Sequence, residues 1–192
     1  MVANGAKVEA EGVFSNGVLV ASVLVLKPQT SVRVEAGLQT KDTTASTITV
    51  LGRAIKVNAD TEWRDRLTSA TQPTVTTLAA LNPADRLEVK AYQDTGGNLI
   101  ATRVERTEAS ALVVVKGPAD AKVPTTQLTL AGIGVTTGAT AQYHDASGAL
   151  IDATTFYGAV QVPPAVPTVV QARGAVATLA TNVVDAASLT PR

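Results

Sequence analysis

A short stretch that occurs twice decides the fold: VRVEAG at residues 32–37, and LVVVKG 80 residues further on, at residues 112–117. At the same spacing Trp63 corresponds to Tyr143, and the sequence aligned in this way needs no gap. Self-similarity at a fixed spacing indicates one structural unit that is used more than once. The chain is therefore predicted to be built from repeats of about 80 residues.

The composition favours β-structure. Of the 192 residues, 45% are hydrophobic but only 3% are aromatic, so the core must consist of Val, Leu, Ile and Ala. Small β-branched side chains pack well on a pleated sheet. The net charge is zero, with 16 basic and 16 acidic residues, which argues against a nucleic-acid partner because such binders carry a basic face. Without cysteine the chain has no disulfide, thiolate zinc site or cysteine nucleophile.

The order of elements predicts a small barrel. In the first repeat, alternating apolar residues and turn signals predict five strands, with a short helix between the third and the fourth. This is the order of an OB-like Greek-key barrel of five strands. The fold class is therefore predicted to be all-β, with tandem barrels of this kind. The predicted strands are residues 32–38, 47–51, 55–58, 86–92 and 98–105, the helix is 74–81, and the second repeat has a less defined element at 152–160.

The N-terminal residues resemble only the end of a repeat. The sequence VEAEG at residues 8–12 matches LEVKA at residues 87–91, and Asn16-Gly17 is a strong signal for a tight hairpin turn. We therefore expect the closing hairpin of an incomplete repeat at residues 1–28. Two whole barrels, at residues 31–107 and 111–187, are expected to follow it and to fold separately.

Four stretches carry a family resemblance: TITVLG at 47–52, NADTEW at 58–63, DRLEVK at 85–90 and GNLIATRVE at 97–105. Together they resemble the bacterial domain-of-unknown-function family 5666. The resemblance implies tandem small β domains in exported or lipid-anchored proteins, and it implies no activity, no cofactor and no catalytic residues. A glycine commonly precedes the Asp-Arg pair in that family, and Ala84 takes its place here.

His144 is the only histidine, and Asp145 follows it directly. Adjacent strand residues point to opposite faces, so the two are badly placed to act as base and orienting group. The first repeat has Arg64 in place of His144. We therefore expect a solvent-facing polar residue and no catalytic site.

Two further sequence patterns resemble ligand-binding motifs, one for calcium and one for a dinucleotide, but neither has the required spacing. Asp60, Glu62 and Asp65 do not have the spacing of a calcium loop, and we expect a solvated strand end instead. The glycines of residues 132–138 approach a dinucleotide fingerprint, but the third glycine comes one residue late and no strand-turn-helix unit surrounds them. No metal or cofactor site is predicted.

Trp63 and Tyr143 leave two interpretations open. Large rings at matching positions are typical of core or barrel-end packing. Alternatively, they form a candidate stacking surface for a glycan or a peptide. Stacking of single-stranded nucleic acid would also need a basic groove, which the balanced charge does not supply.

The apolar run at residues 18–26 is the candidate assembly edge. It is too short to cross a bilayer as a helix, and the preceding Glu9 and Glu11 do not fit a signal peptide. A strand that is apolar on both faces needs cover. The cover is either the next repeat of the same chain or another molecule. The residues of this edge are Val18, Val20, Val23, Leu24, Val25 and Leu26.

We therefore expect a non-enzymatic structural protein that self-associates, such as the subunit of a surface or extracellular filament. The N-terminal hairpin would join the subunits by β-strand addition, which needs main-chain hydrogen bonds but no particular side chains. The alternative is a monomeric cell-envelope module that binds a glycan or a peptide. A hydrolase is the weakest of the three hypotheses. Export is implied by the family resemblance alone, and neither a signal peptide nor a transmembrane segment is predicted.

Overall fold

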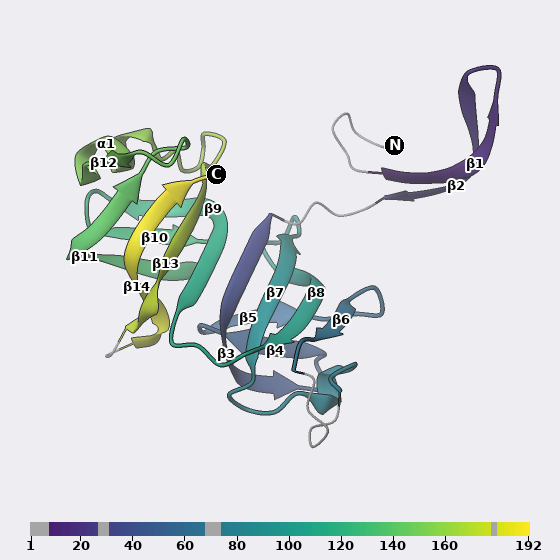
Figure 1. The fold of residues 1–192 in the computed structure, drawn as a ribbon, viewed down its shortest axis with the longest axis horizontal. Coiled ribbons are helices and arrows are strands. Elements are labelled where there is room, and N and C mark those ends of the chain that lie inside the picture. The colour runs from purple at the N-terminus through teal and green to yellow at the C-terminus, as the bar shows by residue number, and fades with distance from the viewer. Residues whose placement is uncertain (1–7, 27–30, 68–73, 178–179) are drawn as a thin grey trace. The chain divides into compact units, whose positions relative to one another are not determined.

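The computed structural model describes residues 8–26, 31–67, 74–177 and 180–192. The chain divides into two compact units, residues 1–30 and residues 31–192. Figure 1 shows that the structure is built almost entirely from strands. No helix among the described residues is long and apolar enough to cross a membrane.

The first unit contains an antiparallel hairpin of β1 (Val8–Ser15) and β2 (Val18–Leu26). Its turn is the predicted Asn16-Gly17 pair, and both residues have positive φ, 51° and 79°. Positive φ at both central residues defines the turn that matches the twist of a hairpin. The two strands form a sheet of their own.

The second unit begins with a closed barrel of five strands. Strand β3 pairs with β4, β4 with β5, β5 in parallel with β8, β8 with β7, and β7 again with β3. The short strand β6 adds to the other side of β8. The elements are β3 (Val32–Asp42), β4 (Thr47–Val50), β5 (Arg53–Lys56), β6 (Glu62–Asp65), the 3-10 turn η1 (Leu78–Ala80), β7 (Arg86–Gln93) and β8 (Leu99–Thr107).

Residues 113–191 close a barrel by the same circuit of pairings. Strand β9 pairs with β10, β10 with β11, β11 in parallel with β14, β14 with β13, and β13 with β9. The elements are β9 (Val113–Val123), β10 (Gln127–Leu130), β11 (Ile133–His144), β12 (Leu150–Ile151), α1 (Ala153–Ala159), β13 (Val169–Ala177) and β14 (Ala180–Pro191).

The gapless alignment of the two repeats is wrong by one residue in the first strand. We call two residues counterparts when they hold the same register position in the two barrels. Val34 pairs with Val89 and Val115 pairs with Ala172, so the counterpart of Val34 lies 81 residues along the chain. The extra residue is absorbed because the loop after β9 is one residue shorter than the loop after β3.

The element between the third and fourth strands differs between the barrels. In the first barrel the helix predicted at residues 74–81 is only the 3-10 turn η1, whose N-cap Thr77 makes no capping hydrogen bond. In the second barrel α1 forms, because the Asp152 carboxylate accepts a hydrogen bond from the Thr155 amide at 2.9 Å. Both elements are held at their C-terminal ends by a lysine of the first strand, Lys41 or Lys122.

The two barrels are joined by main-chain pairing between β3 and β9. Val34 lies opposite Val115, Arg33 opposite Lys116 and Glu35 opposite Val114. The strands of residues 32–191 therefore form one hydrogen-bonded sheet. The prediction that the barrels fold as separate bodies is wrong on this point. Each closed barrel leaves main-chain groups unpaired along one edge of its first strand, and the groups of the two edges form hydrogen bonds with each other.

The core is aliphatic, as the composition predicts, and one cluster of buried side chains runs through both barrels. It consists mainly of Val, Leu, Ile and Ala that alternate along the strands with exposed residues. The second barrel adds three aromatic rings, those of Tyr143, Phe156 and Tyr157. The Tyr157 ring packs edge to face with the other two, and the Tyr143 and Phe156 rings are tilted by 47° to each other.

Candidate functional site

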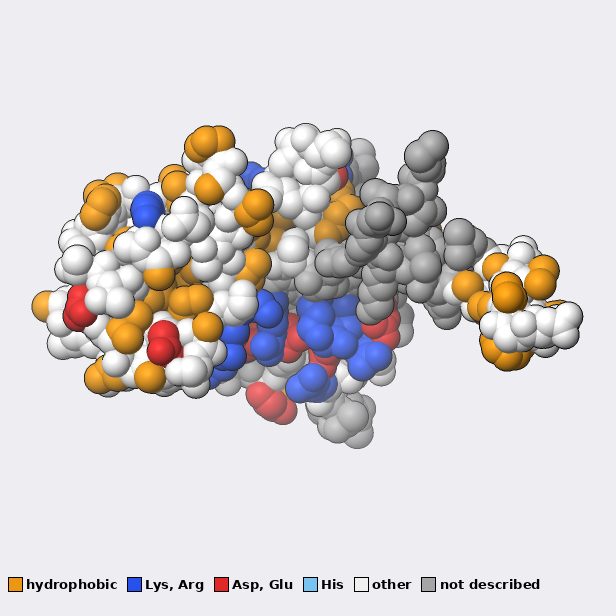
Figure 2. All heavy atoms as spheres, turned by 90° about the horizontal axis from the view of Figure 1, so that it is seen from above, with side chains coloured by type: hydrophobic (Ala, Val, Ile, Leu, Met, Phe, Trp, Pro, Cys, Tyr) orange, Lys and Arg blue, Asp and Glu red, His pale blue; other side chains and the backbone are white. Residues whose placement is uncertain are grey.

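Charged side chains on the outer face of β3, β7 and β8 form two rows in the first barrel, and Figure 2 shows basic and acidic groups interleaved in one patch. Like charges lie directly opposite each other in each row, an arrangement that destabilises a sheet unless it is compensated. The acidic row is Glu35, Glu88 and Glu105, and the basic row is Arg33, Lys90 and Arg103.

The two rows neutralise each other. The Glu88 carboxylate accepts hydrogen bonds from Arg33 and Arg103, each at 3.1 Å. Arg103 also lies 3.2 Å from Glu105. Burial by itself would raise the pKa of Glu88, but the charge of Arg33 and the hydrogen bonds from Arg33 and Arg103 hold this pKa below its usual value. The patch is therefore a closed network in which the carboxylates already bind the cations.

A second ion pair lies beneath this network. Arg106 is 1% exposed, and its Nη2 atom lies 2.6 Å from a carboxylate oxygen of Asp65. The same carboxylate accepts hydrogen bonds from the amides of Leu67 and Val75. It thereby holds the chain after β6 against the barrel.

The second barrel lacks the acidic row. By register, the counterparts of Glu35, Glu88 and Glu105 are Lys116, Gln171 and Thr190. The basic row keeps Arg173 as the counterpart of Lys90. The same outer face has therefore lost its carboxylates while retaining positive charge.

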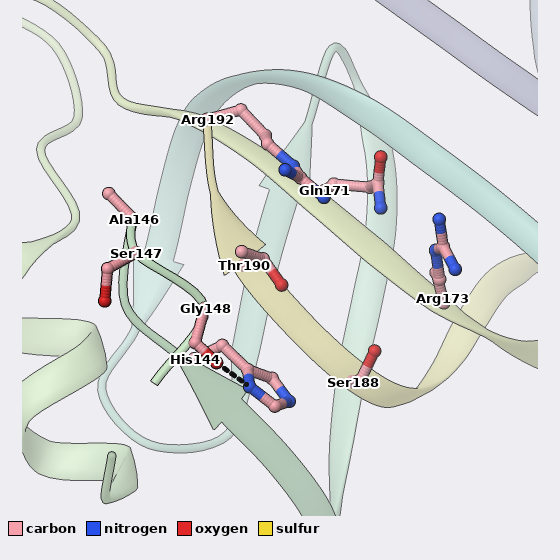
Figure 3. Close-up of a pocket in the computed structure, with 9 residues that line it drawn as sticks. All are labelled: His144, Ala146, Ser147, Gly148, Gln171, Arg173, Ser188, Thr190 and Arg192. Atoms are coloured by element: carbon pink, nitrogen blue, oxygen red, sulfur yellow. Dashed lines mark hydrogen bonds between the residues drawn. The ribbon is translucent and has the colours of Figure 1, made fainter. Parts of the chain in front are cut away.

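A pocket of about 240 Å³ lies on this face, and Figure 3 shows its side chains. Its floor is formed by β13, β14 and the end of β11. In the part of the chain that the structure describes, no carboxylate forms an ion pair with Arg173 or Arg192. The polar residues that line the pocket are His144, Ser147, Gln171, Arg173, Ser188, Thr190 and Arg192.

The orientation of His144 follows from one hydrogen bond. Its Nδ1 atom lies 3.1 Å from the carbonyl oxygen of Gly148. A carbonyl can only accept, so Nδ1 carries the hydrogen and donates, and Nε2 is left for other partners. In Figure 3 the ring lies beside Ser188 and Thr190, while Arg173 and Arg192 stand on either side of them.

His144 and Asp145 do not form a catalytic pair. The Asp145 carboxylate accepts the amides of Ser147 and Ala149, each at 2.9 Å, and stabilises the turn after β11. These bonds and the hydroxyl of Ser147 lower the pKa of Asp145, with the Ser147 side chain making the largest contribution. The carboxylate is therefore engaged in local structure.

The three acidic residues considered for calcium are separated by their partners. Asp65 binds Arg106, Glu62 lies 2.7 Å from Arg64, and Asp60 is exposed in a turn. Among the described residues no group of three or more acidic or histidine side chains is placed to hold a metal ion.

The two rings of the predicted stacking surface lie in different surroundings. Tyr143 is buried, with its ring centroid 5.3 Å from that of Phe156, so it cannot stack on an external ligand. Trp63 is partly buried and lines a shallow pocket of about 370 Å³ with Val57 and Leu78. The two counterparts therefore do not form a common surface.

The described part of the candidate assembly edge is exposed. Val18 and Val20 are each 62% exposed, and Val23 is 47% exposed. The side chains of Leu24, Val25 and Leu26 lie outside the described residues.

The pocket of the second barrel was not predicted as a site, although the sequence held a signal for it. The segment VQARG at residues 170–174 aligns with LEVKA at residues 87–91, and Gln171 stands there in place of Glu88. The loss of a carboxylate beside a retained cation indicates an unbalanced surface. Only the register shows that Thr190 and Lys116 continue the same row.

Residues 33–105 match the family described as Domain of unknown function (DUF5666), which confirms the resemblance found in the sequence. The matched residues begin in β3 and end in β8, so they span the first barrel. Neither the curated proteins nor the solved structures gave a significant match to the chain.

Proposed function

We propose that this protein is a non-enzymatic assembly module of tandem OB-like barrels that associates with further copies through its N-terminal hairpin. The order of pairing in residues 32–107, first strand to second, third, fifth, fourth and back to first, supports the OB-like assignment. The family resemblance supports an exported location, in the periplasm, at the cell surface or outside the cell.

The observation that carries the proposal is that the β1–β2 hairpin has the same irregularity as the hairpins that close both barrels. Its register shifts between Glu11 and Gly12. The register of β7–β8 shifts between Lys90 and Ala91, and that of β13–β14 shifts after Arg173. A β-bulge at one matching position in three hairpins indicates that they are built for the same role.

A side-chain hydrogen bond supports this equivalence. The hydroxyl of Ser22, the extra residue of the bulge, donates to the Glu11 carbonyl at 3.2 Å. Thr102 is the extra residue in β8, and its hydroxyl donates to the Lys90 carbonyl at 3.1 Å. The N-terminal hairpin thus has the local design of a closing hairpin.

A closing hairpin normally has partners on both outer edges. In the first barrel β7 also pairs with β3, and β8 also pairs with β5 and β6. Among the strands that the structure describes, β1 and β2 pair only with each other. Their outer edges therefore present unpaired main-chain groups, which are a template for strand addition.

The faces of the hairpin are apolar as well. Val13 and Phe14 are each 71% exposed, and as neighbours on one strand they point to opposite faces. On β2, Val20 and Leu19 likewise expose the two faces. An isolated hairpin is marginally stable in water, so covering both faces would stabilise it.

A second copy of the chain is the partner that we propose. The first barrel is already closed by its own hairpin, β7–β8, so the place that β1–β2 resembles is occupied within that barrel. A contact between the hairpin of one molecule and a different surface of the next is heterologous, and it can extend into a filament.

The test is the size of the full chain and of Val20→Lys, measured by sedimentation velocity over a range of concentrations and by electron microscopy. We expect oligomers or filaments for the full chain and their loss in Val20→Lys, because a buried ammonium group is costly. Val166→Lys is the matched control, because Val166 is 88% exposed and lies outside the hairpin. A full chain that stays monomeric at high concentration would contradict the proposal.

The alternative is a monomeric cell-envelope module that binds a glycan or a peptide. The partly buried ring of Trp63 in its shallow pocket favours this second candidate. A monomeric full chain whose Trp63 fluorescence responds to a soluble glycan or peptide would support it over assembly.

A further inference from the structure

We propose that the pocket on the second barrel binds an oxyanion, namely the carboxylate, sulfate or phosphate group of a small ligand, between Arg173 and Arg192. This inference does not depend on self-assembly. It rests on the comparison of one outer face in two barrels of the same architecture.

In the first barrel, the basic side chains on this outer face are balanced by carboxylates. There Glu88 and Glu105 lie among Arg33, Lys90 and Arg103, and they bind these cations at distances of 3.1 to 3.7 Å. The carboxylates are therefore built-in anions that balance the basic side chains. Without them the cations would repel one another across neighbouring strands.

The second barrel keeps one cation of the basic row, Arg173, and omits the anions. Val114 and Ser188 stand where the first barrel has Arg33 and Arg103. Gln171 and Thr190 hold the register positions of Glu88 and Glu105, and both line the pocket. Lys116 replaces the third glutamate and lies opposite Gln171 on the neighbouring strand. A ligand anion in the pocket would take the place that the two carboxylates occupy in the first barrel.

The lining residues offer suitable donors. Arg173 and Arg192 can each present a planar fork that matches an oxyanion. The hydroxyls of Ser188 and Thr190 can donate from the floor of the pocket. The volume of about 240 Å³ is below the range of drug-sized sites, which indicates a single anionic group or a small acid.

The proposed binding is selective by charge and sensitive to salt. Arg173 and Arg192 are exposed, so dissolved ions screen their attraction for an anion. A neutral analogue of the same shape should not bind, because it offers no charge-assisted hydrogen bond.

Equilibrium dialysis of the full chain with radiolabelled sulfate, at constant ionic strength, tests the proposal whatever the oligomeric state. We expect saturable binding of one sulfate per chain. Competition by glucuronate and by inorganic phosphate would identify the preferred oxyanion, and glucose serves as the neutral control. The rate at which diethylpyrocarbonate acylates His144, the only histidine, should fall as the ligand occupies the pocket.

Variants locate the site. Arg173→Gln and Arg192→Gln should each weaken binding by about tenfold, because each removes hydrogen bonds from a charged donor. Lys90→Gln removes the counterpart of Arg173 from the first barrel and should leave binding unchanged. Binding that does not saturate, or that is equal in Arg173→Gln and Lys90→Gln, would overturn the proposal. Unchanged acylation of His144 at saturating ligand would also do so.

Discussion

Val34 and Val115 lie directly opposite each other where the two barrels join, and each is the counterpart of the other. The pairing is therefore symmetric: Arg33 faces Lys116, the counterpart of Glu35, and Glu35 faces Val114, the counterpart of Arg33. A contact in which the same patch is used on both sides is isologous, as in a twofold dimer. The chain thus contains an internal pseudo-dimer of barrels.

The first barrel alone is expected to dimerise through the same edge. A fragment of residues 31–110 lacks β9, so the edge of β3 that pairs with β9 in the full chain is free. A second copy of the fragment can pair with this edge in the same register. Arg33 of one copy would then face Glu35 of the other, and opposite charges across strands are favourable. Sedimentation equilibrium should show a dimer.

Charge reversal provides the control for this dimer. Arg33→Glu places two acidic residues opposite each other and should weaken association, and adding Glu35→Arg should restore it. A fragment that is folded and monomeric at all concentrations would contradict the symmetric pairing.

Removing Asp65 should destabilise the fold by about 3–5 kcal/mol, because Asp65→Ala leaves the buried guanidinium of Arg106 without its main partner. The amides of Leu67 and Val75 lose their acceptor at the same time. Urea unfolding followed by the fluorescence of Trp63, the only tryptophan, measures the change. The double variant with Arg106→Leu should recover part of the loss. A single variant as stable as the parent would show that the pair does not stabilise the barrel.

Stability should decrease in acid. Burial would raise the pKa of Asp65, but its hydrogen bonds to Arg106, Val75 and Leu67 lower it below the usual value, and the pKa of Glu88 is lowered as well. A carboxyl whose pKa is lower in the folded state stabilises the fold above its unfolded pKa, about 4. That stability is lost as the pH falls through the folded pKa.

The measurement for this pH dependence is the melting temperature between neutral pH and acid. The Tm should fall below about pH 4, and Glu88→Gln should have a smaller fall because one titrating group is missing. A variant with the same fall in Tm as the parent would exclude Glu88 as a contributor.

Ala84→Gly should stabilise the protein by about 1 kcal/mol. Ala84 has φ of 68°, a left-handed conformation that is costly for residues with a Cβ and readily adopted by glycine. Chemical unfolding measures the gain. Ala36→Gly, in the middle of β3, is the control and should destabilise the strand.

The sequence by itself determined the local elements. Alternation of apolar residues predicted strands at 47–51, 86–92 and 98–105, and β4, β7 and β8 lie there. The Asn16-Gly17 turn needs only the conformational preferences of its own residues. These features depend on neighbours along the chain, which is why they can be read from it.

The tertiary structure decided which distant residues meet. A bulge shifts the register by one residue, and each shift changes which side chains share a row. Thus Arg106 meets Asp65 inside the first barrel, and Arg173 meets no carboxylate among the described residues of the second. The pairing of Val34 with Val115 likewise depends on which strand edge each closed barrel leaves free, because main-chain groups on such an edge need partners that no local pattern specifies.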